Sequence, residues 1–215
     1  MKHIHKGAAP DRLKRWIALG DENWQAEYSN MPQGIKKTVK EALMAEQGWL
    51  CCYCERRLTD EDSHIEHFRP QSNPDVDPLD FSNMLCSCQN QIKTGEPRHC
   101  GHLKEDWFDP FLLVSPLQAN CECQFAFSGI GEIMPAANGD RAADETIARL
   151  GLNIRKLQAL RNKAIEPFLD DFLNKEDLRK FVEGYLDRDA SGQFGQFHTT
   201  IRYLFGNILT NNNLL

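Results

Sequence analysis

Residues 51–104, CCYCERRLTDEDSHIEHFRPQSNPDVDPLDFSNMLCSCQNQIKTGEPRHCGHLK, decide the fold of this chain. Within this stretch, the residue types that bind metals or transfer protons come in a distinctive order. They are a thiol pair, an acid–histidine dyad, a lone Asn, and a second thiol pair followed by a histidine: Cys51 and Cys54, Glu66 and His67, Asn83, Cys88 and Cys100, and His102. This order predicts a single site in which a metal-held scaffold positions a small set of reactive side chains.

The Cys-x-x-Cys pair predicts a structural zinc site. Two residues between Cys51 and Cys54 allow one tight turn to present both thiolates to a tetrahedral ion. Cys88 and Cys100 are the best candidates for the second pair, and the eleven residues between them must then loop out. Cys86 is the alternative to Cys88. Four thiolates leave no open position on the ion, so this zinc would support the fold and take no part in catalysis.

The remaining cysteines are expected to have other roles. Cys52 is expected to be a small buried hydrophobic residue. Cys121 and Cys123 form a Cys-x-Cys pair on an expected strand, where residues two apart share one face. No further ligands lie near them in the sequence, so we interpret this pair as structural.

Glu66, His67, Asn83 and His102 are the candidate catalytic residues. Phosphodiester hydrolysis needs a divalent cation on the scissile phosphate, an activated water and help for the departing oxygen. A neutral His67 can take a proton from water near pH 7, and Glu66, which points to the other side of the strand, can hold the cation. We expect Asn83 to hydrogen-bond the His67 ring and fix its tautomer, and His102 to complete the metal site.

Composition limits the classes of protein that the chain can belong to. It has 215 residues, of which 41% are hydrophobic, and no apolar run of about 18 residues that would span a membrane. Its first seven residues are too polar for the apolar part of a signal peptide, so we expect a cytoplasmic location. Eight cysteines in a cytoplasmic chain favour metal binding over disulfides.

The charge pattern is unusual for a protein that contacts phosphates. The net charge is −6, and residues 51–104 contain six Lys and Arg against nine Asp and Glu. Residues 149–165 carry five basic side chains and no acid, which indicates either a phosphate-binding face or an ordinary solvated helix surface. Single residues that could contact phosphate are Arg69, Arg98, His99 and Lys104.

Hydrophobic spacing and turn residues predict elements on both sides of this stretch. Residues 8–47 read as helical, with Pro10 at the first helical position and Ile35, Val39 and Leu43 on one face. Asn153 is a plausible cap for a helix that follows it. The other expected elements are strands around 51–57 and 64–68, a loop at 70–80, a hairpin at 121–134, helices from 143 onward and near 176–187 and 194–209, and a frayed tail at 210–215.

The central motifs resemble those of an HNH endonuclease domain. More narrowly, the chain resembles the HNH nucleases called PtuB, which act in Septu-type anti-phage defence and in some retron systems. The resemblance rests on 4–13 (IHKGAAPDRL), 51–54 (CCYC), 65–72 (IEHFRPQS), 82–88 (SNMLCSC), 100–104 (CGHLK) and 150–161 (LGLNIRKLQALR). It covers most of the chain, but only the central motifs are specific.

The resemblance implies a prokaryotic cytoplasmic defence nuclease that works with an ABC-type ATPase, PtuA. It implies His67 as general base, Glu66 at the position of the usual metal-binding Asp, and Asn83 as the middle HNH residue. His102 falls near the last histidine or asparagine position of the pattern. The family usually has Asn directly after the cysteine, where this chain has Gly101. The ATPase would also account for the negative charge, because it could recruit the substrate.

The expected fold class is α+β and mainly helical, with a central ββα-metal (HNH) motif and structural zinc between N- and C-terminal helices. We expect a helical segment at 1–48, the HNH core at 49–115, and a hairpin and helical region at 116–215, packed as one compact unit. The expected function is a metal-dependent endonuclease for DNA or RNA, with Zn²⁺ in the structural site and Mg²⁺ or another divalent cation in catalysis. The alternative is a catalytically inert, zinc-stapled binding or adaptor module.

Overall fold

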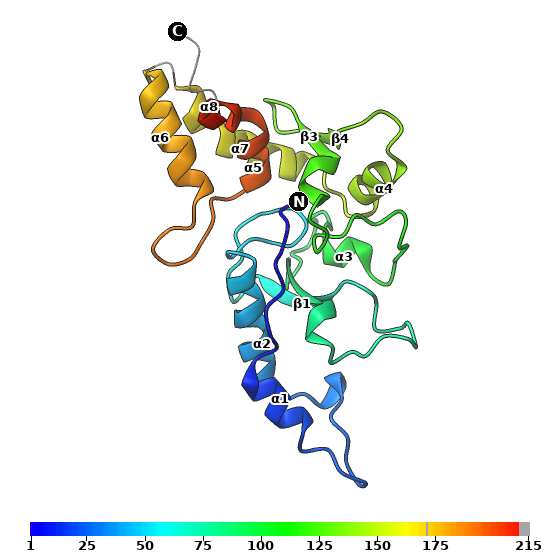
Figure 1. Ribbon diagram of the computed structural model, residues 1–215. Coiled ribbons are helices and arrows are strands. Elements are labelled where there is room, and N and C mark those ends of the chain that lie inside the picture. Colours follow the sequence, from blue (N-terminus) through cyan, green and yellow to red (C-terminus); the bar gives the residue numbers. More distant parts are fainter. Residues whose placement is uncertain (171, 211–215) are drawn as a thin grey trace.

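The computed structural model describes residues 1–170 and 172–210 and combines helices with small antiparallel sheets (Figure 1). The strands are β1 (Ser63–His67), β2 (Met84–Cys88), β3 (Phe125–Phe127) and β4 (Ile133–Pro135). The helices are α1 (Asp11–Ile17), α2 (Gln33–Glu46), α3 (Gly101–Lys104), α4 (Arg141–Arg149), α5 (Arg155–Ile165), α6 (Lys175–Leu186), α7 (His198–Phe205) and α8 (Asn207–Thr210). The described residues also contain four 3-10 turns: η1 (Tyr28–Asn30), η2 (Phe81–Asn83), η3 (Cys121–Gln124) and η4 (Glu166–Leu169). The mixture agrees with the expected α+β class.

The β1–β2 pair is the sheet that carries the candidate site. The strands are antiparallel, with Ile65 opposite Cys86 and His67 opposite Met84. Every residue of β2 is buried. Helix α2 is tied to this strand by Gln47, whose side chain donates to the Cys86 carbonyl at 2.8 Å and accepts from the Cys86 N–H at 2.7 Å. The strand predicted at 64–68 is confirmed as β1, and the loop predicted at 70–80 is confirmed because this segment contains no helix or strand.

The N-terminal region contains two helices where the sequence predicted one continuous helical stretch at 8–47. Helix α1 ends at Ile17, and α2 begins only at Gln33. Between them, the Asp21 carboxylate accepts from the backbone N–H groups of Asn23 and Trp24 and so holds a turn. Pro10 occupies the N-cap of α1, one position earlier than predicted. The apolar face predicted for α2 is correct, since Ile35, Val39 and Leu43 are all buried.

The predicted strand at 51–57 is wrong. This segment is a tight turn, and its one ladder contact is the bridge between Leu50 and Arg57. The Cys51 carbonyl accepts from the Glu55 N–H at 3.1 Å, and Glu55 has φ +64°. A backbone that turns this tightly cannot extend, but it points Cys51 and Cys54 to the same side.

The second sheet confirms the hairpin predicted at 121–134 and corrects its start. Strands β3 and β4 pair with Phe125 opposite Pro135. Cys121 and Cys123 lie before the hairpin in η3, so they do not share one face of a strand. Cys121 is buried and Cys123 is exposed.

The start of α5 also differs from the prediction. Its N-cap is Ile154, without a side-chain hydrogen bond, instead of Asn153. The Asn153 side chain accepts from the Ile133 N–H at 3.1 Å and so joins the start of α5 to β4. The helices predicted from 143 onward and near 176–187 and 194–209 are confirmed as α4 to α8. Most of the tail predicted to fray, residues 211–215, lies outside the described residues.

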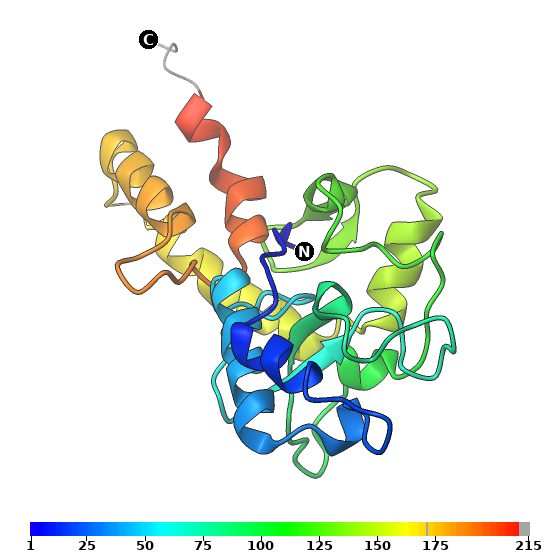
Figure 2. The same cartoon turned by 60° about the horizontal axis from the view of Figure 1, so that its bottom comes forward.

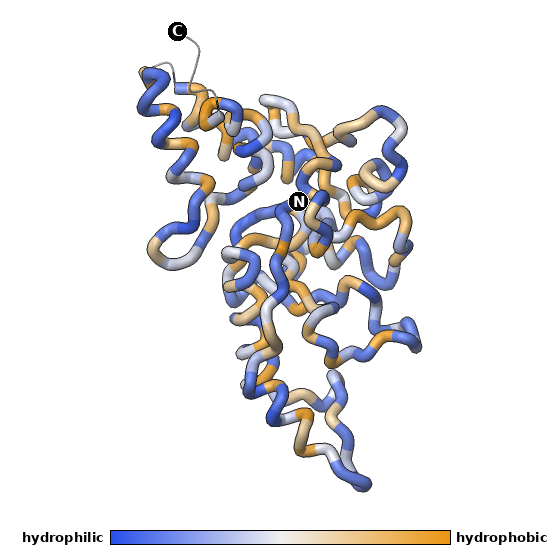
Figure 3. Tube along the Cα trace, viewed as in Figure 1, coloured by the Kyte–Doolittle hydropathy of each residue, from blue (hydrophilic) through white to orange (hydrophobic). Residues whose placement is uncertain are grey.

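Two clusters of buried side chains hold these elements. The larger contains the α1–α2 region, both sheets and the start of α5, from Met1 to Leu157. The smaller lies among α5 to α8 and centres on Ile165, Phe168, Val182 and Ile201. Figures 1 and 2 show α6 to α8 gathered on one side of the molecule. Hydrophilic and hydrophobic residues alternate along α2 and α6, as expected of helices with one buried face (Figure 3). Among the described residues, no helix combines the length and apolar character needed to cross a membrane.

Candidate functional site

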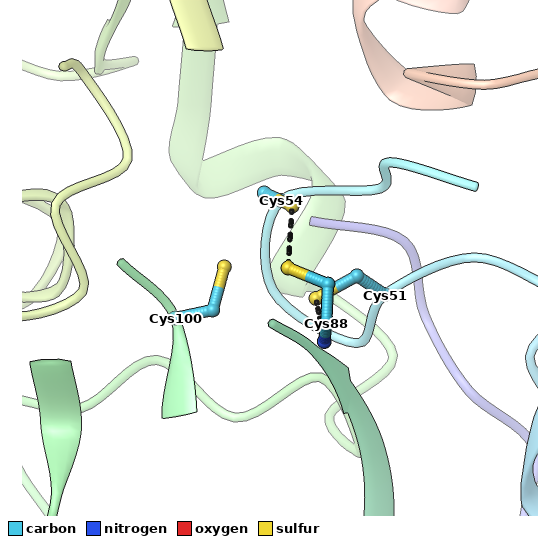
Figure 4. Close-up of side chains that lie close together, drawn as sticks. All are labelled: Cys51, Cys54, Cys88 and Cys100. Atoms are coloured by element: carbon cyan, nitrogen blue, oxygen red, sulfur yellow. Dashed lines mark hydrogen bonds between the residues drawn. The ribbon is translucent and has the colours of Figure 1, made fainter. Parts of the chain in front are cut away.

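Four thiols meet at the base of the β1–β2 hairpin (Figure 4). Cys51 and Cys54 come from the tight turn, Cys88 ends β2, and Cys100 is the N-cap of α3. Their sulfur atoms all lie within 4.8 Å of one another, and the Cys54 and Cys88 sulfurs are 3.7 Å apart. A tetrahedral zinc with Zn–S bonds of about 2.3 Å separates its sulfurs by ~3.8 Å. The spacing of the thiols therefore fits a zinc ion.

The protonation of these thiols supports the same interpretation. Burial by itself raises the pKa of Cys54, but hydrogen bonds from Cys100 and Cys88 outweigh burial and lower the pKa to about 6. The pKa of Cys51 is lowered for similar reasons, whereas the pKa values of Cys88 and Cys100 are raised well above their ordinary value. Two thiolates thus disfavour the ionisation of the other two. A divalent cation would remove that conflict, because it stabilises all four thiolates together.

The structure shows that Cys88, and not the alternative Cys86, belongs to the thiol cluster. The cluster includes Cys88 and leaves out Cys86, whose pKa is raised to about 12, chiefly by burial. Cys52 is 2% exposed, as predicted for a small core residue. The eleven-residue insertion does loop out between Cys88 and Cys100, and it is held to α5 by an ion pair between Glu96 and Lys156.

Two basic side chains, His99 and Arg161, lie close to the thiol cluster. His99 is fully buried, with Nδ1 3.1 Å from the Cys100 sulfur and 3.8 Å from the Cys88 sulfur. This position corrects the expectation that His99 contacts phosphate. Arg161 is also buried and donates to the Gly131 and Leu152 carbonyls. Arg161 is therefore unavailable to a phosphate-binding face, and its charge lies near the thiols.

Glu66 lies in β1 and its carboxylate is almost fully buried. One oxygen, Oε1, accepts from the Tyr53 hydroxyl at 3.0 Å and pairs with the Lys104 ammonium at 3.0 Å. Burial alone would raise the pKa of Glu66, but His64 and Lys104 together outweigh burial and lower it. Glu66 therefore remains a carboxylate. The other oxygen, Oε2, faces His64 at 3.7 Å.

Lys104 has a different role from the one the sequence suggested. Its side chain is 1% exposed, so it does not reach out to phosphate. Besides the Glu66 carboxylate, its ammonium contacts the His67 carbonyl at 3.1 Å. Lys104 thus joins α3 to β1.

His102 lies on α3 beside β1. Its ring packs edge-on against the His64 ring, with 4.9 Å between the ring centroids. Burial and the nearby His64 lower the pKa of His102, which favours the neutral imidazole that can bind a metal.

His67, at the end of β1, is held by contacts that assign its tautomer. Its Nε2 lies 2.9 Å from the Pro78 carbonyl, which can only accept, so Nε2 carries the proton. Nδ1 is then the basic nitrogen, and it accepts from the Gln71 amide at 3.0 Å. Burial lowers the pKa of His67 and keeps the ring neutral. Gln71, Pro78 and Tyr28, which contact the His67 ring, also line a pocket of about 250 Å³. Two larger cavities lie away from His67.

Asn83 does not contact the His67 ring, so this part of the prediction is wrong. Its Oδ1 accepts from the Arg69 N–H and its Nδ2 donates to the Arg69 carbonyl, both at 2.9 Å. Asn83 therefore clamps the chain two residues after His67 to the start of β2. The Pro78 carbonyl, instead of Asn83, fixes the tautomer.

The structure thus arranges the predicted residues in two adjoining groups. The four predicted thiols form one cluster. Glu66, His67 and His102 lie around the end of β1 and the start of α3, with Asn83 as a clamp. The sequence reasoning missed Tyr53, His64 and Pro78 as partners of this group. Only His64, two positions before Glu66 and therefore on the same face of β1, carried a signal that could have identified it.

Comparison with known proteins adds independent information. No protein-family model matches the chain. The chain is 34% identical over 167 residues to a protein of Vibrio cholerae serotype O1 biovar El Tor named "Retron Vc95 putative HNH endonuclease", with 73% of this chain and 78% of that protein aligned. It is 28% identical over 220 residues to an Escherichia coli protein named "Retron Ec83 putative HNH endonuclease", with 84% of each chain aligned.

Proposed function

This chain belongs to the HNH endonuclease family of these retron proteins, and from that premise we propose that it is a metal-dependent nuclease that hydrolyses phosphodiester bonds in nucleic acid. The observation that carries the proposal is the tautomer of His67. With its proton held on Nε2 by the Pro78 carbonyl, the ring offers Nδ1 as a base next to a buried carboxylate. The hydrogen-bond partners of the ring, Gln71 and Pro78, line a pocket of about 250 Å³, and this supports access of water to His67.

In the proposed reaction, His67 Nδ1 takes a proton from water while the water oxygen attacks phosphorus in line with the departing 3′ oxygen. Gln71 must release Nδ1 for this step, and a water molecule can replace its amide. The bond from phosphorus to the 3′ oxygen then breaks, and solvent supplies the proton that this oxygen needs.

Glu66 and His102 are the proposed ligands of the catalytic cation. Carboxylate and imidazole are ligands that divalent ions accept, and the geometry supports the pair, because Glu66 Oε2 faces the His64 ring and the His102 ring packs against that ring. When bound, such an ion neutralises charge on the phosphate and on the departing oxygen. Lys104 holds Glu66 through Oε1 and so fixes the direction in which Oε2 points.

We assign a structural zinc to Cys51, Cys54, Cys88 and Cys100, and we interpret β1, β2 and α3 as the ββα-metal motif. The fit of the thiol spacing to zinc and the order of the elements support this assignment. The divisions at 1–48, 49–115 and 116–215 remain our proposal for the organisation of the chain.

We also propose that the chain acts in the cytoplasm as the nuclease of a PtuB-like anti-phage defence complex with an ABC-type ATPase. The negative charge of the chain supports a partner that binds the nucleic acid, because acidic side chains outnumber the basic ones that would bind phosphates. The net charge is −6, Arg161 is buried, and Arg149 and Lys156 are in ion pairs. The isolated chain should therefore bind DNA and RNA weakly and with a shallow salt dependence. Tight binding with a steep salt dependence would contradict the role given to the ATPase.

Replacing His67 by Ala tests the nuclease proposal. We expect the variant to keep its zinc and its circular dichroism spectrum and to lose cleavage of DNA and RNA in the presence of Mg²⁺ or Mn²⁺, assayed with the ATPase. His5→Ala is the matched control, because His5 is exposed and lies in another part of the chain. Unchanged biological activity in His67→Ala would favour the alternative, an inert zinc-stapled adaptor.

A further inference from the structure

His64 was not among the residues expected to bind the catalytic cation, but it faces the free oxygen of Glu66. The His64 Nε2 lies 3.7 Å from Glu66 Oε2. This distance is too long for a good hydrogen bond but suits two ligands of one ion, which lie ~3–4 Å apart when each bond is about 2.1 Å.

The ring nitrogens of His64 lack strong partners. Nδ1 is buried and has no hydrogen-bond partner among the residues that the structure describes. A polar atom buried without a hydrogen-bond partner destabilises the folded protein unless another interaction compensates for it. Coordination of a cation by His64 Nε2, beside Glu66, is an interaction that would stabilise the ring in this position.

Gly101 provides the space that His64 occupies. A Cβ atom at residue 101 would lie 2.4 Å from Glu66 Oε2 and 2.9 Å from His64 Nε2. A side chain at residue 101 and the observed positions of His64 and Glu66 therefore exclude each other. The glycine at residue 101 therefore leaves the space in which the imidazole meets the carboxylate.

The Oε2 atom of Glu66 is available to a cation, because the other contacts of this carboxylate are made by Oε1. Tyr53 and Lys104 both bind Oε1. His102 is partly buried and packs against the His64 ring, with 4.9 Å between the ring centroids, so the two imidazoles adjoin this oxygen from the same side.

We propose that His64 is a third protein ligand of the catalytic cation, in the space that Gly101 leaves beside Glu66. This inference rests on the cation site of the proposed function. Two imidazoles and one carboxylate suit a transition ion such as Mn²⁺, Zn²⁺, Ni²⁺ or Co²⁺ better than Mg²⁺, which prefers oxygen ligands.

Titration of the zinc-loaded protein with Mn²⁺, followed by the EPR signal of free Mn²⁺, tests the inference without a cleavage assay. We expect one Mn²⁺ site in the unmodified protein and a loss of affinity of about tenfold or more in His64→Ala. Matched controls are His67→Ala and His5→Ala, which should bind Mn²⁺ as the unmodified protein does. Mn²⁺ affinity that is unchanged in His64→Ala but lost in His102→Ala would overturn the inference and leave the cation site in place.

Gly101→Asn, alone and combined with His64→Ala, provides a second test that does not depend on the single His64→Ala variant being correctly folded. Gly101→Asn should weaken Mn²⁺ binding on its own, because its side chain displaces His64 and Glu66. Adding His64→Ala to it should cause little further loss, because His64 is already displaced in Gly101→Asn, whereas additive losses would count against the inference. If the unmodified protein bound no Mn²⁺, the inference would fail, and loss of cleavage in His67→Ala would show separately whether the nuclease proposal stands.

Discussion

Replacing Lys104 by Met should destabilise the protein because it leaves the Glu66 carboxylate buried without its cation. The two side chains are 1% and 9% exposed, and their charged atoms are 3.0 Å apart. Removing one partner of a buried pair destabilises a protein by about 3–5 kcal/mol, and the lost contact with the His67 carbonyl adds about 1 kcal/mol. A total near 5 kcal/mol is a large part of the 5–15 kcal/mol that typically stabilises a domain.

Urea unfolding of the zinc-loaded protein at pH 7, without other divalent ions, measures this effect. Lys14→Met is the matched control, because Lys14 pairs with Asp11 on the surface, where both side chains are more than half exposed. We expect at most about 1 kcal/mol for that control. The double variant Lys104→Met with Glu66→Gln should recover part of the loss, because it no longer buries an unpaired charge. A loss in Lys104→Met as small as in Lys14→Met would refute the reasoning.

The pH dependence of this effect has a definite sign. With Lys104 present, the pKa of Glu66 lies below its ordinary value, so its stabilisation is lost only as the pH falls below about 4.3. In Lys104→Met, burial dominates and the pKa rises above the value in the unfolded chain. The destabilisation should therefore be greatest near neutral pH and shrink as the pH falls through the raised pKa.

Three further changes have defined outcomes. Asn83→Ala removes both side-chain hydrogen bonds to the Arg69 backbone and should lower the free energy of unfolding, measured in urea, by about 1–3 kcal/mol and reduce cleavage. His198 donates to the Leu186 carbonyl, and burial lowers its pKa, so the protein should lose stability as the pH falls below about 6.5, with a slope of at most about 1.4 kcal/mol per pH unit from this residue. His198→Gln should reduce that slope in thermal melts, and an unchanged slope would contradict the assignment. Cys100→Ser should lose zinc, measured by metal analysis, and unfold at a much lower temperature, because the free energy of zinc binding contributes to folding.

The sequence predicted those parts of the site that depend on local spacing. Cys51 and Cys54 belong to one turn, and Glu66 and His67 are neighbours on one strand, so their relation follows from backbone geometry. The four zinc ligands could also be predicted, because residues 51–104 offer few other cysteines. The choice between Cys86 and Cys88 could not be made, since both lie on β2 and share a face.

Contacts across loops could not be predicted. The partner of the His67 ring is a carbonyl of Pro78, and any residue in the 70–80 loop can supply a carbonyl. Asn83 was assigned to the wrong partner for the same reason, since its amide can bind any backbone group within reach. Arg161 was expected among the basic residues of a helix surface. Its burial depends on the Gly131 and Leu152 carbonyls that accept from it, and helical spacing alone does not show where those carbonyls lie.

The thiol cluster and the cation site are linked through the first turn of α3, and this link gives the zinc an indirect part in the chemistry. Cys100 is both a cluster member and the N-cap of α3, so Gly101 and His102 begin where the cluster ends. The Gly101 N–H also donates to the Ser87 hydroxyl, which lies 3.8 Å from the Cys51 sulfur. Loss of zinc frees Cys100 to move, and a shift of the helix start would displace His102 and refill the space beside Gly101. A zinc-free protein that stayed folded should therefore bind Mn²⁺ more weakly than the zinc-loaded protein, and equal affinity in the two forms would show that the sites are independent.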